Sequence, residues 1–170
     1  MTPCATLVRH LAHRSRIVHN RLYDTVRLPL GARLARLAAE GVLRGRSVLL
    51  VDDDPVVRLI LGSHLRHASA EVDEATDGKE VVDCALRQGR SHDAIVMDEH
   101  MPALSGAAAT RRIRAHQGSQ GQRPTPILGV SSDAGARTRR FIGAGMNAHL
   151  AKPFGRDEFI AAVQRLLASG

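Results

Sequence analysis

Short hydrophobic or alternating runs are interleaved with amphipathic stretches along the chain from Ser47 onward. The short runs are four to six residues long and lie at 47–52, 70–75, 94–97, 126–131 and 148–151. The longer stretches have helical spacing and lie at about 55–67, 78–89, 104–116, 134–144 and 156–168. This alternation is typical of repeated βα units, so we predict an α/β domain with five parallel strands.

The make-up of the runs indicates where each strand lies in the sheet. VLLV at 48–51 and AIVM at 94–97 are continuously apolar, which favours central strands buried on both faces. The run at 70–75 alternates and carries acidic residues, so we place it at or near an edge. The last helical stretch has one apolar face, which we expect to pack on the sheet; it consists of Phe159, Ile160, Val163, Leu166 and Leu167.

Charge divides the chain into two parts. Residues 1–46 hold nine arginines and two acidic residues, which accounts for the whole formal charge of +7. Residues 47–170 hold 15 basic and 15 acidic groups. We therefore predict an Arg-rich N-terminal extension at 1–46, partly helical or flexible, and one domain of ordinary size at 47–170. A neutral domain with only a basic arm, in a chain with four aromatic side chains, argues against a nucleic-acid-binding module.

Composition also indicates the cellular compartment and the kind of hydrophobic core. No apolar run approaches the roughly 18 residues of a membrane span, and Arg and His interrupt the first twenty residues too often for a signal peptide. The two cysteines, Cys4 and Cys84, match neither a metal-binding spacing nor a disulfide framework. We expect a cytoplasmic protein whose core is aliphatic.

Carboxylates gather where the predicted strands end. Asp52, Asp53 and Asp54 follow the first run, and Asp98 follows the third. In a parallel sheet these ends lie at one edge. Gathered carboxylates repel one another unless a cation neutralises them, and oxygen ligands suit Mg²⁺. We therefore predict a Mg²⁺ site at Asp52, Asp53 and Asp98, whereas Asp54, before Pro55, is expected to cap the next helix.

The fourth and fifth runs add a hydroxyl group and a cation to the same edge. Ser131 ends the fourth run, and Lys152, one of only two lysines, follows the fifth. A carboxylate nucleophile, a metal, a hydroxyl and an ammonium together are typical of phosphoryl transfer. Asp98 would then carry the phosphoryl group as an aspartyl phosphate.

Four segments resemble the sequence blocks of a response-regulator receiver domain from two-component signalling, in the same order and at fitting separations. They are VLLVDDDPVVRLIL, IVMDEHMPALSG, ILGVSS and GAGMNAHLAKPF. The match covers about 47–169, and DDDP and MPALSG look closer to the receivers of hybrid histidine kinases. The resemblance implies a flavodoxin-like (βα)5 fold, with a doubly wound sheet in the strand order 2-1-3-4-5.

Carried over residue by residue, the resemblance makes Asp98 the phosphoacceptor. Asp52 and Asp53 become the acidic pair that binds Mg²⁺, together with Asp98 and the backbone carbonyl of His100. The same resemblance makes Ser131 the hydroxyl that responds to phosphorylation.

The resemblance further makes Lys152 the partner of the phosphate, with a cis peptide bond between Lys152 and Pro153. His149 stands where the family usually has Tyr or Phe, an aromatic ring that moves inward when the hydroxyl residue engages the phosphate. Because imidazole ionises near neutral pH, two interpretations of His149 stay open, a pH-sensitive switch residue and a plain strand residue.

The resemblance implies a signalling domain of a bacterial phosphorelay and not an enzyme with a kinase domain. It would take its phosphoryl group from a histidine kinase or phosphotransfer protein and change its binding to a downstream protein. One alternative is a receiver-like interaction module that works without phosphorylation. Another is a phosphatase of the haloacid-dehalogenase type, which needs a second Asp where this chain has His100.

Two interpretations of the extension stay open. The segment DTVRLPLG at 24–31 faintly resembles the final strand of a histidine-kinase ATP-binding domain, but the extension has no nucleotide-binding boxes. It is then either a remnant of a hybrid kinase or an arm for docking or for forming a homodimer.

Overall fold

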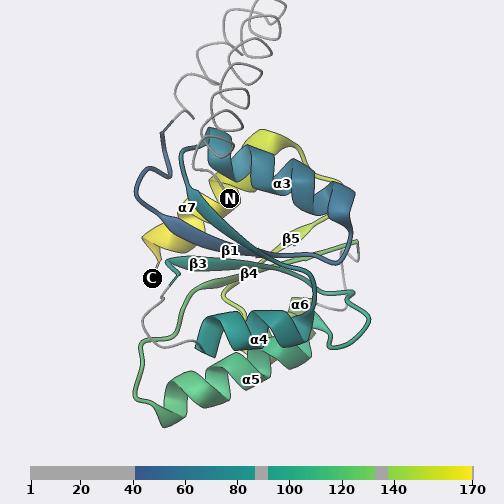
Figure 1. Ribbon diagram of the computed structural model, residues 1–170, viewed down its shortest axis with the longest axis vertical. Coiled ribbons are helices and arrows are strands. Elements are labelled where there is room, and N and C mark those ends of the chain that lie inside the picture. Colours follow the sequence, from purple (N-terminus) through teal and green to yellow (C-terminus); the bar gives the residue numbers. More distant parts are fainter. Residues whose placement is uncertain (1–40, 87–91, 133–137, 170) are drawn as a thin grey trace, which may run out of the picture. The chain divides into compact units, whose positions relative to one another are not determined.

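A parallel sheet with the strand order β2-β1-β3-β4-β5 forms the centre of the domain (Figure 1). The protein is described by a computed structural model over residues 41–86, 92–132 and 138–169. The strands are β1 Ser47–Val51, β2 Glu71–Ala75, β3 Ala94–Asp98, β4 Ile127–Ser131 and β5 Ala148–Ala151. Each bound lies within one residue of the predicted one. The predicted order is confirmed, as are the edge position of β2 and the central positions of β1 and β3.

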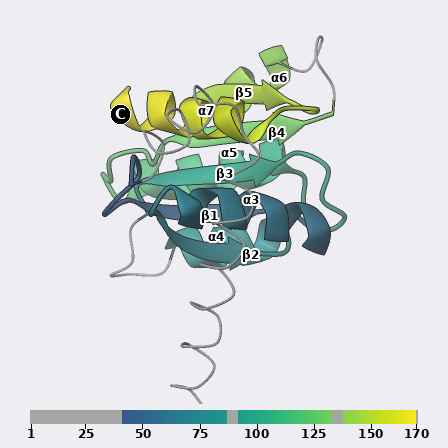
Figure 2. The ribbon, with the colours of Figure 1, turned by 90° about the horizontal axis from the view of Figure 1, so that it is seen from above.

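Helices cover both faces of the sheet, as a doubly wound fold requires. The described helices are α3 Pro55–His67, α4 Gly78–Leu86, α5 Gly106–Ser119, α6 Thr138–Ala144 and α7 Arg156–Ala168. Figures 1 and 2 show α3 and α7 on one face, while α4 and α5 lie on the other. The predicted bounds of α3 and α7 are confirmed, whereas α5 begins two residues later and ends three residues later than predicted.

The core has two layers, because successive side chains of a strand point to opposite faces of the sheet. Val48, Leu50 and Val96 belong to the layer beneath α3 and α7, which also holds Phe159. The opposite layer lies between the sheet and helices α4, α5 and α6; its buried strand residues are Leu49, Val51, Ala75, Ile95, Met97 and Ile127. The core is mainly aliphatic, as predicted, although Phe141 and Phe159 are among its largest fully buried side chains.

The packing of the domain begins a few residues before β1. Leu43 is buried in the layer beneath α3 and α7, and its backbone N–H donates to the carbonyl of Ala68 at 2.9 Å. Residues 1–40 of the extension, which include segment 24–31, lie outside the described residues. The predicted division at residue 46 and the predicted partly helical or flexible character of the extension therefore stay predictions. Within the described ranges, no helix has the length and apolar character that crossing a membrane requires.

Candidate functional site

Three of the predicted site residues meet at the carboxyl edge of the sheet. Asp52 follows β1, Asp98 ends β3, and Lys152 follows β5. The ammonium Nζ of Lys152 lies 2.8 Å from Oδ1 of Asp98 and 3.4 Å from Oδ2 of Asp52. Both carboxylates are buried, with exposed fractions of 2% for Asp52 and 6% for Asp98. One lysine therefore joins two buried acidic groups that are 46 residues apart in the sequence.

The three groups perturb one another electrostatically. Burial raises the pKa of Asp52, because it disfavours the charged form, and neighbouring Asp98 adds to this, while Lys152 opposes it. Burial alone would lower the pKa of Lys152, but the hydrogen bond and charge of Asp98, together with the charge of Asp52, outweigh it. The pKa of Lys152 is therefore raised, and the ammonium stays charged at neutral pH.

The three consecutive aspartates after β1 have three different environments. The buried Asp52 accepts a hydrogen bond at Oδ1 from the backbone N–H of Asp54, at 2.9 Å. Asp54 itself caps α3, because its Oδ1 accepts from the N–H groups of Val56 and Val57 at 2.7 and 3.2 Å. The predicted helix cap is thus confirmed. The side chain of Asp53, between them, is exposed.

The loop after β3 holds Asp98 closely. The second carboxylate oxygen, Oδ2, accepts from the backbone N–H of His100 at 2.7 Å. Gly106 lies against the backbone of Asp98, since a Cβ atom on this glycine would come within 2.4 Å of the Asp98 carbonyl oxygen. A side chain at position 106 would therefore push against the strand end that carries Asp98.

Glu99 is a buried site residue that the sequence did not single out. It is 3% exposed, and its carboxylate accepts from the N–H of Ala107 in the first turn of α5, at 2.9 Å. A carboxylate near a helix N-terminus is favourable. Glu99 thus ties the end of β3 to α5, and only its place directly after Asp98 hinted at it.

The described residues contain no group of three or more His, Cys, Asp or Glu side chains arranged to hold a metal ion. The structure does bring Asp52 and Asp98 together, while Asp53 and His100 are exposed. The donor chemistry nevertheless fits Mg²⁺, because two buried carboxyl groups face a single ammonium, which leaves oxygen ligands for a hard cation. The predicted ligand set of Asp52, Asp53, Asp98 and the His100 carbonyl stays a prediction.

Ser131 and His149 form a second polar contact, between β4 and β5. Ser131 is buried, and its Oγ lies 3.0 Å from Nε2 of His149. The imidazole also stacks on the ring of Phe141 in α6, with 4.6 Å between ring centroids. Burial lowers the pKa of His149, so the ring is neutral at neutral pH. The roles of Ser131 and His149 in switching stay predictions.

The chain after β5 also has the predicted backbone geometry. The peptide bond between Lys152 and Pro153 is cis, which confirms the expectation from the resemblance. The N–H of Lys152 donates to the carbonyl of Ser131 at 2.7 Å.

Comparison with known protein families places most of the described domain in one of them. Residues 48–164 match the family model for the response regulator receiver domain. The match includes all five strands except the first residue of β1, and it includes the predicted site residues from Asp52 to Lys152.

Curated relatives with similar sequences come from several kingdoms. The peroxide stress-activated histidine kinase mak3 of Schizosaccharomyces pombe is 30% identical over 128 residues, which is 74% of this chain and 6% of that protein. The two-component response regulator ORR41 of Oryza sativa is 35% identical over 114 residues, covering 65% of this chain and 86% of that protein. The chain spans between 6% and 14% of the histidine kinases among these relatives.

A solved structure supports the same placement. The receiver domain of the sensor histidine kinase PA1611 from Pseudomonas aeruginosa has a TM-score of 0.64 and 35% identity, covering 73% of this chain and 98% of that one. That structure has a magnesium ion coordinated in its active site cleft. The predicted bacterial origin of this chain stays a prediction, because its relatives include fungal and plant proteins.

Proposed function

Because the chain belongs to the response regulator receiver domain family, we propose that it accepts a phosphoryl group on Asp98 from a phosphohistidine donor. The observation that carries this proposal is the position of the Asp98 carboxylate. It is buried at the end of a central strand, with one oxygen on the Lys152 ammonium and the other on the His100 N–H. Such fixed donors stabilise the negative charge that phosphoryl transfer places on oxygen.

The transfer itself needs no further protein nucleophile. A carboxylate oxygen of Asp98 forms a bond to phosphorus while the bond between phosphorus and the donor's imidazole nitrogen breaks. The electron pair of that bond stays on the imidazole. Lys152 would hold the transferred phosphoryl oxygens by charge, because its ammonium already contacts the accepting carboxylate. The chain is then a phosphoacceptor that assists its own modification.

We assign the cation of this site to Mg²⁺, held by the side chains of Asp52, Asp53 and Asp98 and by the carbonyl of His100. When bound, Mg²⁺ supplies positive charge that screens the carboxylates from the incoming phosphoryl group. The surroundings of Asp52 support a further cation here, because this buried carboxyl group lies close to Asp98 and the two share one ammonium, that of Lys152.

The response would start at Ser131. Its hydroxyl contacts His149, and a new phosphoryl group on Asp98 would offer it a charged acceptor instead. Exchange of that partner would free the imidazole from Ser131 and shift the surface around α6 and β5 between two populations. We propose that a downstream protein reads this shift.

The donor would be a histidine kinase or phosphotransfer protein in the cytoplasm. An exposed apolar face lies on α3 directly after the acidic loop, formed by Val56, Leu59 and Ile60. Contiguous exposed apolar residues beside a polar site are typical of contacts with another protein. This face supports a protein donor over a small metabolite. The use of the extension for docking or homodimer formation stays a prediction.

The proposal is tested by intact-protein mass spectrometry after incubation with Mg²⁺ and acetyl phosphate. We expect one acid-stable, base-labile phosphoryl adduct, which is absent with chelator and in Asp98→Asn. The matched control is Asp83→Asn, which changes an exposed aspartate of α4 and should leave the adduct intact. An adduct that persists in Asp98→Asn would contradict the proposal, and no adduct under any condition would favour an interaction module that works without phosphorylation.

A further inference from the structure

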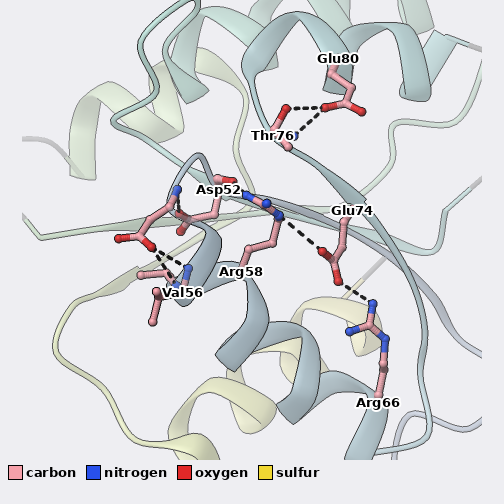
Figure 3. A network of polar contacts seen from close by, with 9 residues as sticks. Asp52, Val56, Arg58, Arg66, Glu74, Thr76 and Glu80 are labelled. Atoms are coloured by element: carbon pink, nitrogen blue, oxygen red, sulfur yellow. Dashed lines mark hydrogen bonds and ion pairs between the residues drawn. The ribbon is translucent and has the colours of Figure 1, made fainter. Parts of the chain in front are cut away.

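An arginine of α3 holds the end of β1 from outside the acidic cluster (Figure 3). NH1 of Arg58 donates to the backbone carbonyl of Asp52 at 2.7 Å. Nε of the same guanidinium lies 3.4 Å from Oε2 of Glu74 on β2. The Arg58 side chain is only 16% exposed, so water competes weakly for these contacts. Arg58 thus connects α3, the end of β1 and the edge strand β2.

The contact that holds the Asp52 carbonyl also helps to fix the position of Asp53. The carbonyl of Asp52 and the N–H of Asp53 belong to one planar peptide unit, so fixing the oxygen fixes the orientation of the whole plane. The preceding peptide is held as well, because the N–H of Asp52 donates to the carbonyl of Ala75 at 3.3 Å. Contacts outside the loop therefore fix the peptide that enters Asp53, and the N–H of Asp54 on Oδ1 of Asp52 holds the peptide that follows it. Together these peptides set the direction in which the Asp53 side chain leaves the backbone.

Asp53 depends on this backbone support because its carboxylate has no anchor among the described residues. Asp52 has Asp54 and Lys152 as partners, and Asp54 has the first turn of α3. Across the residues that the structure describes, none makes a hydrogen bond or ion pair with the exposed Asp53 side chain. Of the three aspartates, it is the one whose position follows from the backbone alone.

The chemistry of the contact favours arginine at position 58. The planar guanidinium of Arg58 donates to a carbonyl through one N–H group while a second nitrogen forms an ion pair with a carboxylate, whereas a lysine ammonium acts as a point charge. Glu74 offsets the positive charge of Arg58, and Glu74 is also paired with Arg66 of the same helix. Arg58 therefore contacts the backbone of the site, while its charge is partly offset by Glu74 and does not pair with Asp52 or Asp98.

We propose that Arg58 is a positioning residue for the acidic pair, setting the Asp53 carboxylate so that it can complete a cation site with Asp52 and Asp98. Arg58 acts through the Asp52–Asp53 peptide and touches neither the cation nor the phosphoryl group. The inference rests on the proposed function. According to this inference, Arg58 controls the Mg²⁺ affinity of the site. The affinity in turn sets the rate of phosphorylation when Mg²⁺ is limiting.

The test compares Arg58→Lys with Arg66→Lys in the full chain. Both variants keep the charge and weaken an arginine pairing with Glu74, but only the first loses the geometry of the contact to Asp52. Mg²⁺ alone is titrated by calorimetry. We expect Arg58→Lys to raise the Kd for Mg²⁺ by about tenfold or more, as loss of an outer partner of a metal site does, and Arg66→Lys to change it by less than about twofold.

A second readout separates positioning from general destabilisation. For Arg58→Lys, the phosphorylation rate with acetyl phosphate should be low at limiting Mg²⁺ and return close to the wild-type rate at saturating Mg²⁺. Thermal unfolding with chelator should be similar for the two lysine variants. If Arg58→Lys does not fold, Glu74→Gln, which weakens the support of Arg58 without removing it, should still raise the Kd measurably.

The outcomes distinguish this inference from the proposed function. Wild-type protein that neither binds Mg²⁺ nor forms an adduct would overturn both. Wild-type protein that does both, with equal Mg²⁺ affinity in Arg58→Lys and Arg66→Lys, would overturn the positioning role alone. An unchanged Kd in Glu74→Gln, where Arg58→Lys is unfolded, would overturn it as well.

Discussion

The two halves of the candidate site are held in different ways. At the ends of β1 and β3, Asp52 and Asp98 are buried and each has a backbone N–H and the Lys152 ammonium as partners. Between β4 and β5, the hydroxyl of Ser131 faces a neutral imidazole that is stacked on a ring of α6. Charged hydrogen bonds are roughly twice as strong as neutral ones. We therefore expect the first half to stay in place and, under the proposed function, the second half to exchange partners.

Under the proposed function, this difference would separate phosphoryl and cation binding from the response at one edge of the sheet. Under the proposed function, a rigid acidic half would present a fixed geometry to the cation and the phosphoryl group, so that little reorganisation is needed during transfer. A hydroxyl that contacts a neutral imidazole can shift toward a charged acceptor when one appears. Each of the following variants is chosen to affect one half and spare the other.

Loss of Lys152 should have the largest effect, because it removes the only charged group that joins the two carboxylates in the described site. We expect Lys152→Met to slow phosphorylation of Asp98 about a hundredfold, which is typical of losing one donor to a developing charge. The rate is measured by mass spectrometry over time with acetyl phosphate. Lys79→Met changes the chain's other lysine, which is exposed, and should leave the rate unchanged. Equal rates in the two variants would contradict the role of Lys152.

Crowding the backbone of Asp98 should destabilise the rigid half. In Gly106→Ala, the new Cβ would lie 2.4 Å from the Asp98 carbonyl oxygen, so the strand or helix must shift. We expect a loss of about 2 kcal/mol in the free energy of unfolding, measured with urea.

Gly118 in the same helix provides the control. A Cβ on Gly118 would meet nothing within 4 Å, so Gly118→Ala should stabilise the protein by about 0.5–1 kcal/mol through better helix propensity. If both alanine variants shifted stability in the same direction, the close approach at Gly106 would not be the cause.

Substitutions of two neighbouring aspartates should have separate effects, one on stability and the other on cation binding. Asp54→Ala removes the cap of α3 and should reduce the free energy of unfolding by about 1 kcal/mol, with little change in Mg²⁺ affinity. Asp53→Ala should do the reverse, because its carboxylate is exposed and contributes little to packing. Urea unfolding with chelator and calorimetric titration of Mg²⁺ measure the two quantities. A stability loss in Asp53→Ala that matches Asp54→Ala would break the distinction.

The smallest expected effect is a change in the pH dependence of stability, which comes from His149 in the second half of the site. Burial lowers the pKa of His149 below its ordinary value of 6.5, so the unfolded chain takes up the proton at a higher pH than the folded chain. The contribution of His149 to the free energy of unfolding is fully present above about pH 6.5. It is lost as the pH falls toward the lower pKa that His149 has in the folded chain. His149→Phe should keep the stack on Phe141 and remove this part of the pH dependence.

The pH comparison must be made between the variant and the wild type, because His64 behaves similarly. Burial also lowers the pKa of His64, so the wild-type curve contains both groups. An NMR titration of the His149 ring, with and without phosphorylation, tests the proposed switch directly. Identical titration in both states would show that His149 does not respond to Asp98.

Local patterns were enough to predict most of the fold. Strand bounds followed from short apolar runs with polar ends, and α3 could be placed because Asp54 and Pro55 are strong local start signals. The start of α5 was predicted two residues early, at 104. Its actual start at Gly106 depends on Ser105 as cap and on the buried carboxylate of Glu99, and the latter is a tertiary contact.

The site was predictable in its chemistry and less so in its geometry. Because parallel strands end at one edge, the meeting of Asp52, Asp98 and Lys152 followed from the order of the runs. The sequence could not separate the buried Asp52 from the exposed Asp53, since the two are chemically identical neighbours. The contact of Arg58 with the Asp52 carbonyl and the stacking of His149 on Phe141 depend on how the helices pack.

The central claim is that Asp98 carries the phosphoryl group. It is tested most directly by treating the phosphorylated protein with borohydride, which reduces an acyl phosphate of aspartate to homoserine, and then sequencing its peptides by mass spectrometry. The account predicts homoserine at position 98 in the wild type and at no other aspartate. Homoserine at a different aspartate, or a phosphoryl group mapped to a histidine, would contradict it.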